Sequence, residues 1–140
     1  MDIMDVTTIK DVFTSYHTIA VVGISEKQER ASNMIARYLI EQGFTVYAVN
    51  PLLKEVLGLP CYPSLSSIPA EQRGKIEIVN IFRKSADVPP VVDEAIAIGA
   101  KVIWMQSGII NKDAAILAKK AGLFVVENRC IAVEHQHLYH

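Results

Sequence analysis

Hydrophobic residues along this chain gather into five short runs, at residues 19–22, 44–49, 76–82, 101–105 and 123–126. Each run is nearly continuous in apolar residues. Runs of this length and character are typical of strands that are buried on both faces of a parallel sheet. The pattern therefore predicts five buried strands.

Between these runs, apolar residues recur three and four positions apart, the spacing of helices with one buried face. This spacing predicts helices at residues 34–42, 87–98, 111–121 (capped by Asn111) and 131–138, and a short one near 6–13 capped by Asp5 or Thr7. Residues 52–74 hold three prolines and are predicted to be irregular, with an extended piece at 57–62 and a helical turn at 66–71. Strands that alternate with helices predict an α/β fold, a doubly wound, mostly parallel, Rossmann-like sheet of about five strands, in a single domain over residues 1–140.

The connection after the first strand is a candidate phosphate site. Gly23 allows a tight turn there, and the side-chain oxygens of Ser25, Ser32 and Asn33 could begin the next helix. A loop of this kind directs free N–H groups and the positive end of the helix dipole at one spot, which suits a phosphate. The alternative is an ordinary strand-to-helix turn, because a single glycine falls short of the G-x-G-x-x-G pattern of dinucleotide sites.

The other strands also end in polar residues, Gly or Pro. These segments are Asn50-Pro51, Phe82-Arg83, Gln106-Ser107-Gly108 and Glu127-Asn128-Arg129. Ligands of doubly wound sheets bind at the carboxyl ends of the strands. Strand ends meet water in any fold, yet hydrogen-bonding groups at all five ends favour a polar ligand.

The residues after the second strand narrow the choice of ligand. An NAD site usually has Asp or Glu there, whereas this chain has Asn50-Pro51. Basic residues are near instead, namely Lys27, Arg30, Lys54 and Arg83. They suit a nucleotide with an additional ribose phosphate, such as coenzyme A or NADP. The alternative is that Lys27, Arg30 and Lys54 are solvated surface charges.

Composition excludes several other classes of protein. The net charge of -1 over 140 residues does not favour binding to nucleic acid or to an anionic membrane. The 2 cysteines are too few for a disulfide framework. The sequence has no basic-then-apolar leader and no apolar run of about 18 residues, so a cytoplasmic location is the default expectation.

Several segments together resemble the small bacterial and archaeal CoA-binding proteins, which are similar to the CoA-binding domain of the succinyl-CoA synthetase α subunit. The segments are VVGIS, YAVNP, LGLPCYPSL, IVNIFR, EAIAIGAKVIWMQSGI, NKDAA, AGLFVVENRCI and EH, together with Arg30 and Ser32. The resemblance runs from about Thr18 to His135. It implies a Rossmann-like domain that binds CoA non-covalently at the strand ends.

The resemblance also implies roles for individual residues. The loop Gly23, Ile24 and Ser25, with Ser32 and Asn33, would hold phosphate, and Lys27 and Arg30 lie in the same loop. Asn50 and Pro51 would line the adenosine site, with Lys54 near the ribose phosphate; Phe82, Arg83, Gln106, Ser107 and Gly108 would line the other side of the cleft. The chain departs from the family pattern in two places: G-I-S has a larger central residue than usual, and Glu127-Asn128 stands where Met-Asp is more common.

The sequence does not predict catalysis. In succinyl-CoA synthetase, the histidine that becomes phosphorylated during catalysis belongs to another domain. Three of the 4 histidines of this chain lie near the C-terminus. Cys130 could form a mixed disulfide with CoA, or a metal site with His135 and His137, but a buried thiol and a helix end are the plainer interpretations. We therefore expect a CoA-binding or acyl-CoA-binding module that is not an enzyme and contains no metal. The alternatives are an NADP-dependent reductase, and an interaction protein with a vestigial nucleotide site; domains of this size also often form homodimers.

Overall fold

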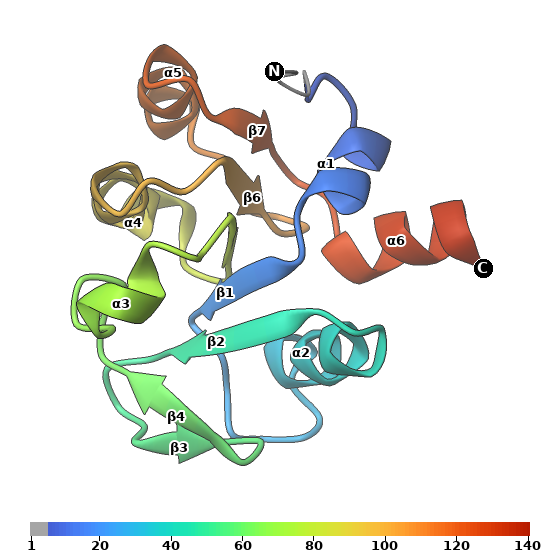
Figure 1. Ribbon diagram of the computed structural model, residues 1–140, viewed down its shortest axis with the longest axis vertical. Helices are drawn as coiled ribbons and strands as arrows, with labels where there is room; N and C mark the ends of the chain where they lie inside the picture. Colours follow the sequence, from blue (N-terminus) through green and yellow to red (C-terminus); the bar gives the residue numbers. More distant parts are fainter. Residues whose placement is uncertain (1–5) are drawn as a thin grey trace.

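The computed structural model describes residues 6–140 and contains a seven-stranded sheet with helices on both faces (Figure 1). The strands are β1 (Thr18–Val22), β2 (Thr45–Val49), β3 (Glu55–Val56), β4 (Leu59–Tyr62), β5 (Ile78–Ile81), β6 (Val102–Met105) and β7 (Phe124–Val126). The helices are α1 (Ile9–Ser15), α2 (Ala31–Glu41), α3 (Ala70–Arg73), α4 (Val88–Ala97), α5 (Lys112–Lys120) and α6 (Ile131–Tyr139), and a 3-10 turn, η1 (Ser85–Asp87), leads into α4. No helix from residue 6 onward is both long and apolar enough to cross a membrane.

The strands lie in the order β3-β4-β2-β1-β5-β6-β7. All neighbours are parallel except β3 and β4, which form an antiparallel hairpin. From β1 the chain builds outward through β2 to β4, and then returns to the other side of β1 to add β5, β6 and β7. The predicted doubly wound, Rossmann-like sheet is confirmed, and its switch point lies between β1 and β5.

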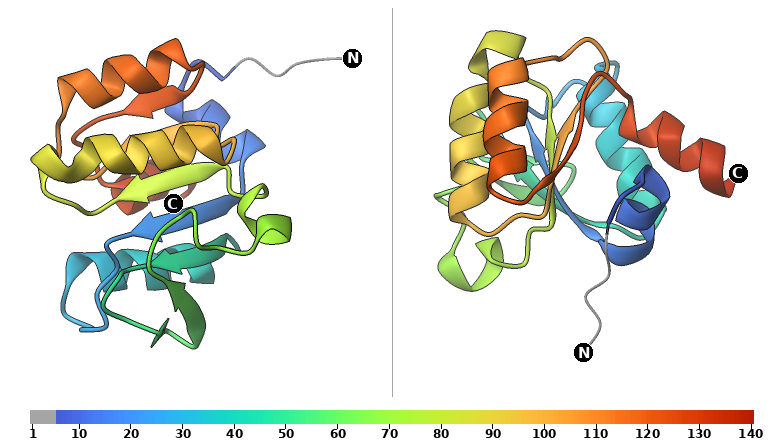
Figure 2. Two further views of the ribbon diagram at one scale, coloured as in Figure 1. Left: turned by 90° about the vertical axis from the view of Figure 1, so that its left-hand side faces the viewer. Right: turned by 90° about the horizontal axis from the view of Figure 1, so that it is seen from above.

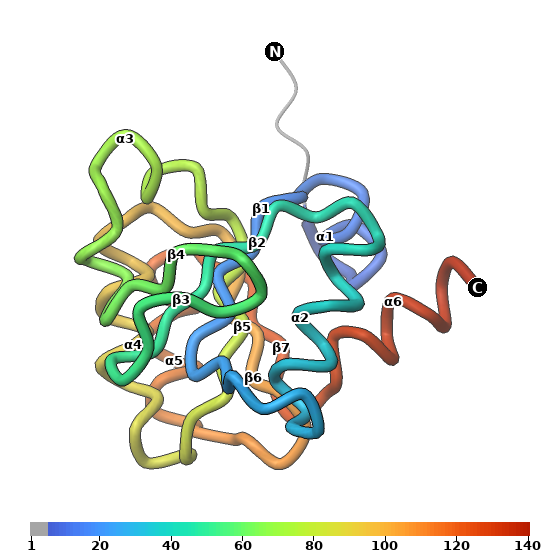
Figure 3. Tube along the Cα trace, turned by 90° about the horizontal axis from the view of Figure 1, so that it is seen from below, coloured from blue at the N-terminus to red at the C-terminus, as the bar shows by residue number. Residues whose placement is uncertain are grey.

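Two layers of helices enclose the sheet. In Figures 2 and 3, α1, α2 and α6 cover one face, and α4 and α5 cover the other. Each face has its own buried core: Phe13, Leu39 and Ile131 pack on the first face, and Val92 and Ala118 pack on the second. The end of α6 extends away from the sheet, so the C-terminus lies far from the strands (Figure 1).

The five predicted strands are all present, and the structure adds two more. β4 falls within the extended piece expected at residues 57–62, whereas β3 was not predicted. Leu57 and Gly58 connect the two strands, and both have positive φ angles, of 55° and 73°. Two-residue hairpin turns require this backbone conformation, which is unusual for leucine.

The helix starts agree with the prediction in part. Asn111 caps α5 as predicted, because its Oδ1 accepts a hydrogen bond from the N–H of Ala114 at 2.9 Å. At α1, the N-cap is Thr8 and not Thr7. The Thr8 hydroxyl accepts from the N–H of Asp11 at 3.2 Å, and the Asp11 carboxylate accepts from the N–H of Thr8 at 3.0 Å. This reciprocal pair is a capping box; Asp5, the other predicted cap, lies outside the described residues.

Candidate functional site

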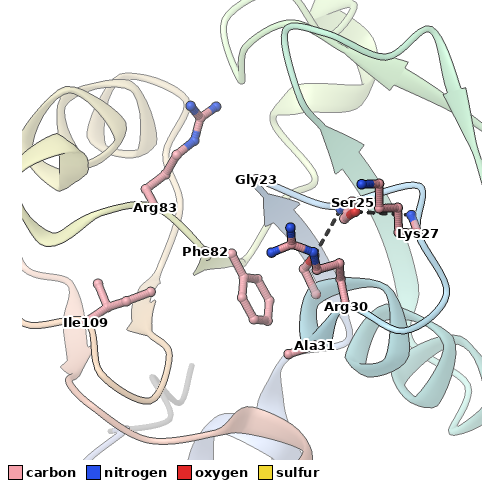
Figure 4. A pocket seen from close by; sticks show the side chains of 9 residues that line it. Gly23, Ser25, Lys27, Arg30, Ala31, Phe82, Arg83 and Ile109 are labelled. Carbon is pink, nitrogen blue, oxygen red and sulfur yellow. Dashed lines mark hydrogen bonds between the residues drawn. The ribbon is translucent and has the colours of Figure 1, made fainter.

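A cleft of about 390 Å³ opens at the carboxyl ends of β1 and β5, at the switch point of the sheet (Figure 4). Its walls come from the loop after β1, the start of α2, the residues after β5 and the loop after β6. The residues that line it are Gly23, Ser25, Lys27, Arg30, Ala31, Ser32, Phe82, Arg83 and Ile109. This is the place where a doubly wound sheet binds its ligands.

Gly23 allows the two central strand ends to lie close together. Its φ is +93°, and a Cβ atom at this position would overlap the carbonyl oxygen of Phe82. The Gly23 N–H donates to the carbonyl of Val49 at 2.8 Å, and the Phe82 N–H donates to the carbonyl of Val22 at 2.8 Å. Only glycine combines this backbone conformation with this approach, so the floor of the cleft depends on Gly23.

The loop between Gly23 and α2 is held by polar contacts to Ser25. The Ser32 hydroxyl oxygen accepts from the N–H of Ser25 at 2.9 Å, and the Asn33 amide donates to the Ser25 carbonyl at 2.8 Å. The Ser25 hydroxyl in turn accepts from the N–H of Lys27 at 3.1 Å. Ser32 and Asn33 therefore shape the loop. Neither of them caps α2, contrary to the sequence prediction, and Ser25 does not cap it either.

The N-terminus of α2 opens on the cleft. Its N-cap is Arg30, whose side chain forms no capping hydrogen bond. Within residues 6–140, the backbone N–H groups of Ala31 and Ser32 have no hydrogen-bond acceptor. Free N–H groups and the positive end of the helix dipole favour an anion at this position.

Three cations surround the cleft and no carboxylate lines it. Lys27 and Arg30 are exposed, and neither joins an ion pair among the described residues. Arg83 is half-buried, and its Nε atom is buried without a hydrogen-bond partner. Figure 4 shows Lys27 and Arg30 on one side of Gly23 and Arg83 on the other. This arrangement suits a ligand that carries more than one phosphate.

Seven of the fifteen residues predicted for the site line this cleft: Gly23, Ser25, Lys27, Arg30, Ser32, Phe82 and Arg83. Pro51, Lys54 and Ser107 are exposed and lie outside the lining, as does Gly108, whose N–H donates to the Asn128 side chain at 2.6 Å. A role of these four residues in ligand binding stays a prediction.

The other four predicted residues do not line the cleft either. Ile24 is fully buried, and Asn33 is buried behind the loop. Asn50 donates to the carbonyl of Ile24 at 2.7 Å, and Gln106 accepts from the N–H of Ile131 at 3.0 Å. The side chains of Asn33, Asn50 and Gln106 are therefore already engaged with the protein backbone.

The sequence analysis missed two lining residues, Ala31 and Ile109. Ile109 directly follows the predicted segment Gln106–Gly108, so extending that segment by one residue would have included it. Ala31 carries no chemical signal, because a small apolar residue is ordinary at the start of a helix.

Of the two C-terminal histidines considered as metal ligands, His135 has another place in the structure. His135 is buried, and its Nδ1 lies 2.7 Å from the hydroxyl of Tyr38. The rings of Phe13, Phe44 and Tyr139 pack around it, with centroids 4.8–5.4 Å away. Burial, and to a smaller extent His140, lowers the pKa of His135 below its ordinary value. His135 thus joins α6 to α1 and α2 through aromatic packing.

The residues beside His135 do not line the cleft. The Glu134 carboxylate accepts from Arg129 at 3.4 Å, and the half-buried Cys130 is the N-cap of α6. Among residues 6–140 there is no group of three His, Cys, Asp or Glu side chains that could hold a metal ion. The redox role considered for Cys130 stays a hypothesis.

Comparison with known proteins finds relatives of two kinds, a protein of similar size and a much longer ligase. A family model described as a CoA binding domain matches residues 17–136. An uncharacterized protein of Bacillus subtilis, YneT, is 36% identical over 127 residues, which are 91% of each chain. An ADP-forming acetate–CoA ligase of Archaeoglobus fulgidus is 29% identical over 125 residues, which are 82% of this chain and 18% of the ligase.

A solved structure has the same fold over its whole length. A hypothetical protein from Pyrococcus horikoshii superimposes with a TM-score of 0.89 at 42% identity, over 98% of this chain and 100% of that one. The similarity therefore covers every strand of the sheet and the loops that form the cleft.

Proposed function

Because the chain belongs to the family of CoA binding domains, we propose that the cleft between β1 and β5 binds coenzyme A or an acyl-CoA non-covalently. The observation that carries the proposal is the group of unpaired cations at that cleft, above all the buried Nε of Arg83 that has no partner. A buried guanidinium nitrogen without an acceptor is costly, and a phosphate oxygen would supply the acceptor.

The cleft suggests how the parts of such a ligand would be arranged. The pyrophosphate would lie over the free N–H groups at the start of α2, between Arg30 and Arg83. The adenosine would extend toward Asn50 and Pro51, with Lys54 close to the ribose 3′-phosphate, as the resemblance implies. Lys54 is exposed and available for such a contact.

We propose no catalysis by this chain alone. The nine residues that line the cleft include no histidine, cysteine or carboxylate, so the lining offers no histidine or carboxylate base to activate the hydroxyls of Ser25 or Ser32. Incubation of the protein with acetyl-CoA tests this part of the proposal. The thioester absorbance should decay at the rate seen in buffer, and faster decay would identify an enzyme.

Isothermal titration with CoA tests the proposal directly, with dephospho-CoA and NADP as comparators. We expect CoA to bind in the micromolar range and NADP to bind much more weakly. Preference for NADP would favour a reductase. Absence of binding by any of the three ligands, with the fold intact, would favour an interaction protein whose nucleotide site is vestigial.

A further inference from the structure

Asn80 differs from the other buried polar residues of the described chain. Its exposed fraction is 0%, and neither its Nδ2 nor its Oδ1 has a hydrogen-bond partner. The other buried polar side chains each form at least one hydrogen bond; they are Ser32, Asn33, Gln106 and His135. A buried amide without partners costs folding free energy. Asn80 therefore has an unmet hydrogen-bonding capacity in the free protein.

Asn80 lies on the strand that leads into the cleft. It is on β5, beside Val21 of β1 and Trp104 of β6. Phe82 is two residues further along the chain, so its side chain is on the same face of the sheet, and it lines the cleft. Figure 4 shows the Phe82 ring in the cleft between Ile109 and the start of α2. The Phe82 side chain is thus the part of the lining nearest to Asn80 along the strand.

The lining of the cleft accounts for the phosphates of CoA but offers little to its neutral arm. The cations Lys27, Arg30 and Arg83 can meet phosphates, whereas the side chains of Ala31, Phe82 and Ile109 are apolar. The two serine hydroxyls already accept hydrogen bonds from backbone N–H groups of the loop before α2. The pantetheine arm carries two secondary amides, each with one donor and one acceptor. An asparagine side chain offers the complementary pair.

Resting on the proposed function, we propose that Asn80 is a binding residue for the amide-bearing arm of coenzyme A. In this arrangement the Phe82 ring turns aside as the arm enters, and an amide of the arm pairs with Nδ2 and Oδ1 of Asn80. The folding cost of the unpaired amide is then recovered in the complex. The residue would thereby distinguish CoA from nucleotides that have the same phosphates and no amide arm.

Titration of the Asn80→Val variant tests this inference. The ligands are CoA and 3′-phosphoadenosine 5′-diphosphate, the part of CoA that lacks the arm. We expect CoA affinity to fall about tenfold, as loss of one or two neutral hydrogen bonds produces. We expect the affinity for the armless nucleotide to be unchanged and the melting temperature to be equal or higher. Ile78→Val, on the same face of the same strand, is the matched control and should alter neither affinity.

Three outcomes would overturn the inference. An unchanged CoA affinity in Asn80→Val would show that the arm does not use this amide. Equal losses for both ligands would show that the substitution acts on the cleft as a whole. Failure of the wild-type protein to bind CoA would overturn the proposed function as well, and the wild-type titration alone identifies that case.

A measurement on the wild-type protein covers the case in which Asn80→Val does not fold. The side-chain amide of Asn80 gives a pair of resonances in a ¹⁵N-labelled sample. CoA should shift this pair, and the armless nucleotide should leave it in place. A pair that responds equally to both ligands, or to neither, would contradict the proposed contact.

Discussion

At the scale of single residues, both the fold and the site depend on the absence of a side chain at Gly23. Its missing side chain allows β1 and β5 to meet at the floor of the cleft. We expect Gly23→Ala to lower the free energy of unfolding by more than about 2 kcal/mol, because the backbone is strained and the new methyl group overlaps Phe82. Urea unfolding followed by circular dichroism measures this change.

Gly74 is the matched control for this substitution. Its backbone is right-handed helical, with φ of -69°, and a Cβ there would meet nothing within 4 Å. Gly74→Ala should leave the stability unchanged or slightly higher. A loss at Gly74 as large as the loss at Gly23 would show that neither close approach nor backbone conformation explains the effect.

Arg83 offers a second prediction at this scale. Because its Nε has no partner in the protein, Arg83→Ala should weaken CoA binding and leave the melting temperature unchanged. Loss of a charge-assisted contact costs roughly 1.5–3 kcal/mol, which is about tenfold to a hundredfold in affinity. We expect similar losses for CoA and dephospho-CoA in isothermal titration, since Arg83 lines the cleft opposite Arg30 and so faces the pyrophosphate position.

The neighbouring Lys84 is the control for Arg83, since it is exposed and does not line the cleft. Lys84→Ala should bind CoA as the wild-type protein does. A loss in Arg83→Ala that is confined to CoA and spares dephospho-CoA would instead place Arg83 at the 3′-phosphate.

At the scale of the element, the start of α2 and the loop before it form one unit. Ser32 lies in the first turn of the helix and accepts a hydrogen bond from Ser25 of the loop. Ser32→Ala leaves the partly buried N–H of Ser25 without its partner. We expect this substitution to lower the free energy of unfolding by about 1 kcal/mol, measured in urea. Ser107→Ala, at an exposed serine after β6, should change it by less than about 0.5 kcal/mol.

The elements show what the sequence could and could not predict. The β1–α2 unit was predictable because a buried apolar run ends at a glycine and helical spacing follows. The β3–β4 hairpin was not, because β3 has two residues and its turn is Leu57-Gly58, not the Asn-Gly or Asp-Gly pair that marks such turns. Its stability comes from pairing β4 with β2, a contact that no local pattern displays.

The same limit applies to the site. Phe82 and Arg83 were predictable because they follow a buried strand and lie at the edge where parallel strands end. Gln106 was predicted as a ligand contact by the same logic, and Asn33 from its place at an expected helix start and from the family resemblance, yet their amides bind the protein backbone. An amide at a strand or helix end can serve either purpose, and only the positions of the neighbouring backbone groups decide between them.

At the scale of the whole molecule, His135 makes the stability depend on pH. Its pKa is lowered in the folded protein, so the unfolded chain binds a proton more readily. Stability is therefore retained above the ordinary pKa of about 6.5 and is lost as the pH falls from there toward the lowered value. We expect the unfolding midpoint in urea to decrease between pH 7.5 and pH 5.5.

Comparison of variants isolates the contribution of His135 from those of other titrating groups. His135→Gln can still form a hydrogen bond with Tyr38 but does not titrate, so its midpoint should depend less on pH than that of the wild-type protein. His137→Gln, at an exposed position of the same helix, should keep the wild-type dependence. Identical pH profiles for His135→Gln and the wild-type protein would contradict the assignment.

The two ends of the strand order have a consequence for association through the sheet. The outermost strands, β3 and β7, contain two and three residues. An edge this short presents few unpaired backbone groups to which another chain could add a strand. The longer, apolar strands all lie inside these edges with a strand on each side, and β4 covers the outer side of β2 at Ala48 and Val49. The order of the strands thus protects the segments most prone to form fibrils, and the exposed Glu55 adds a charge to the two-residue edge strand β3.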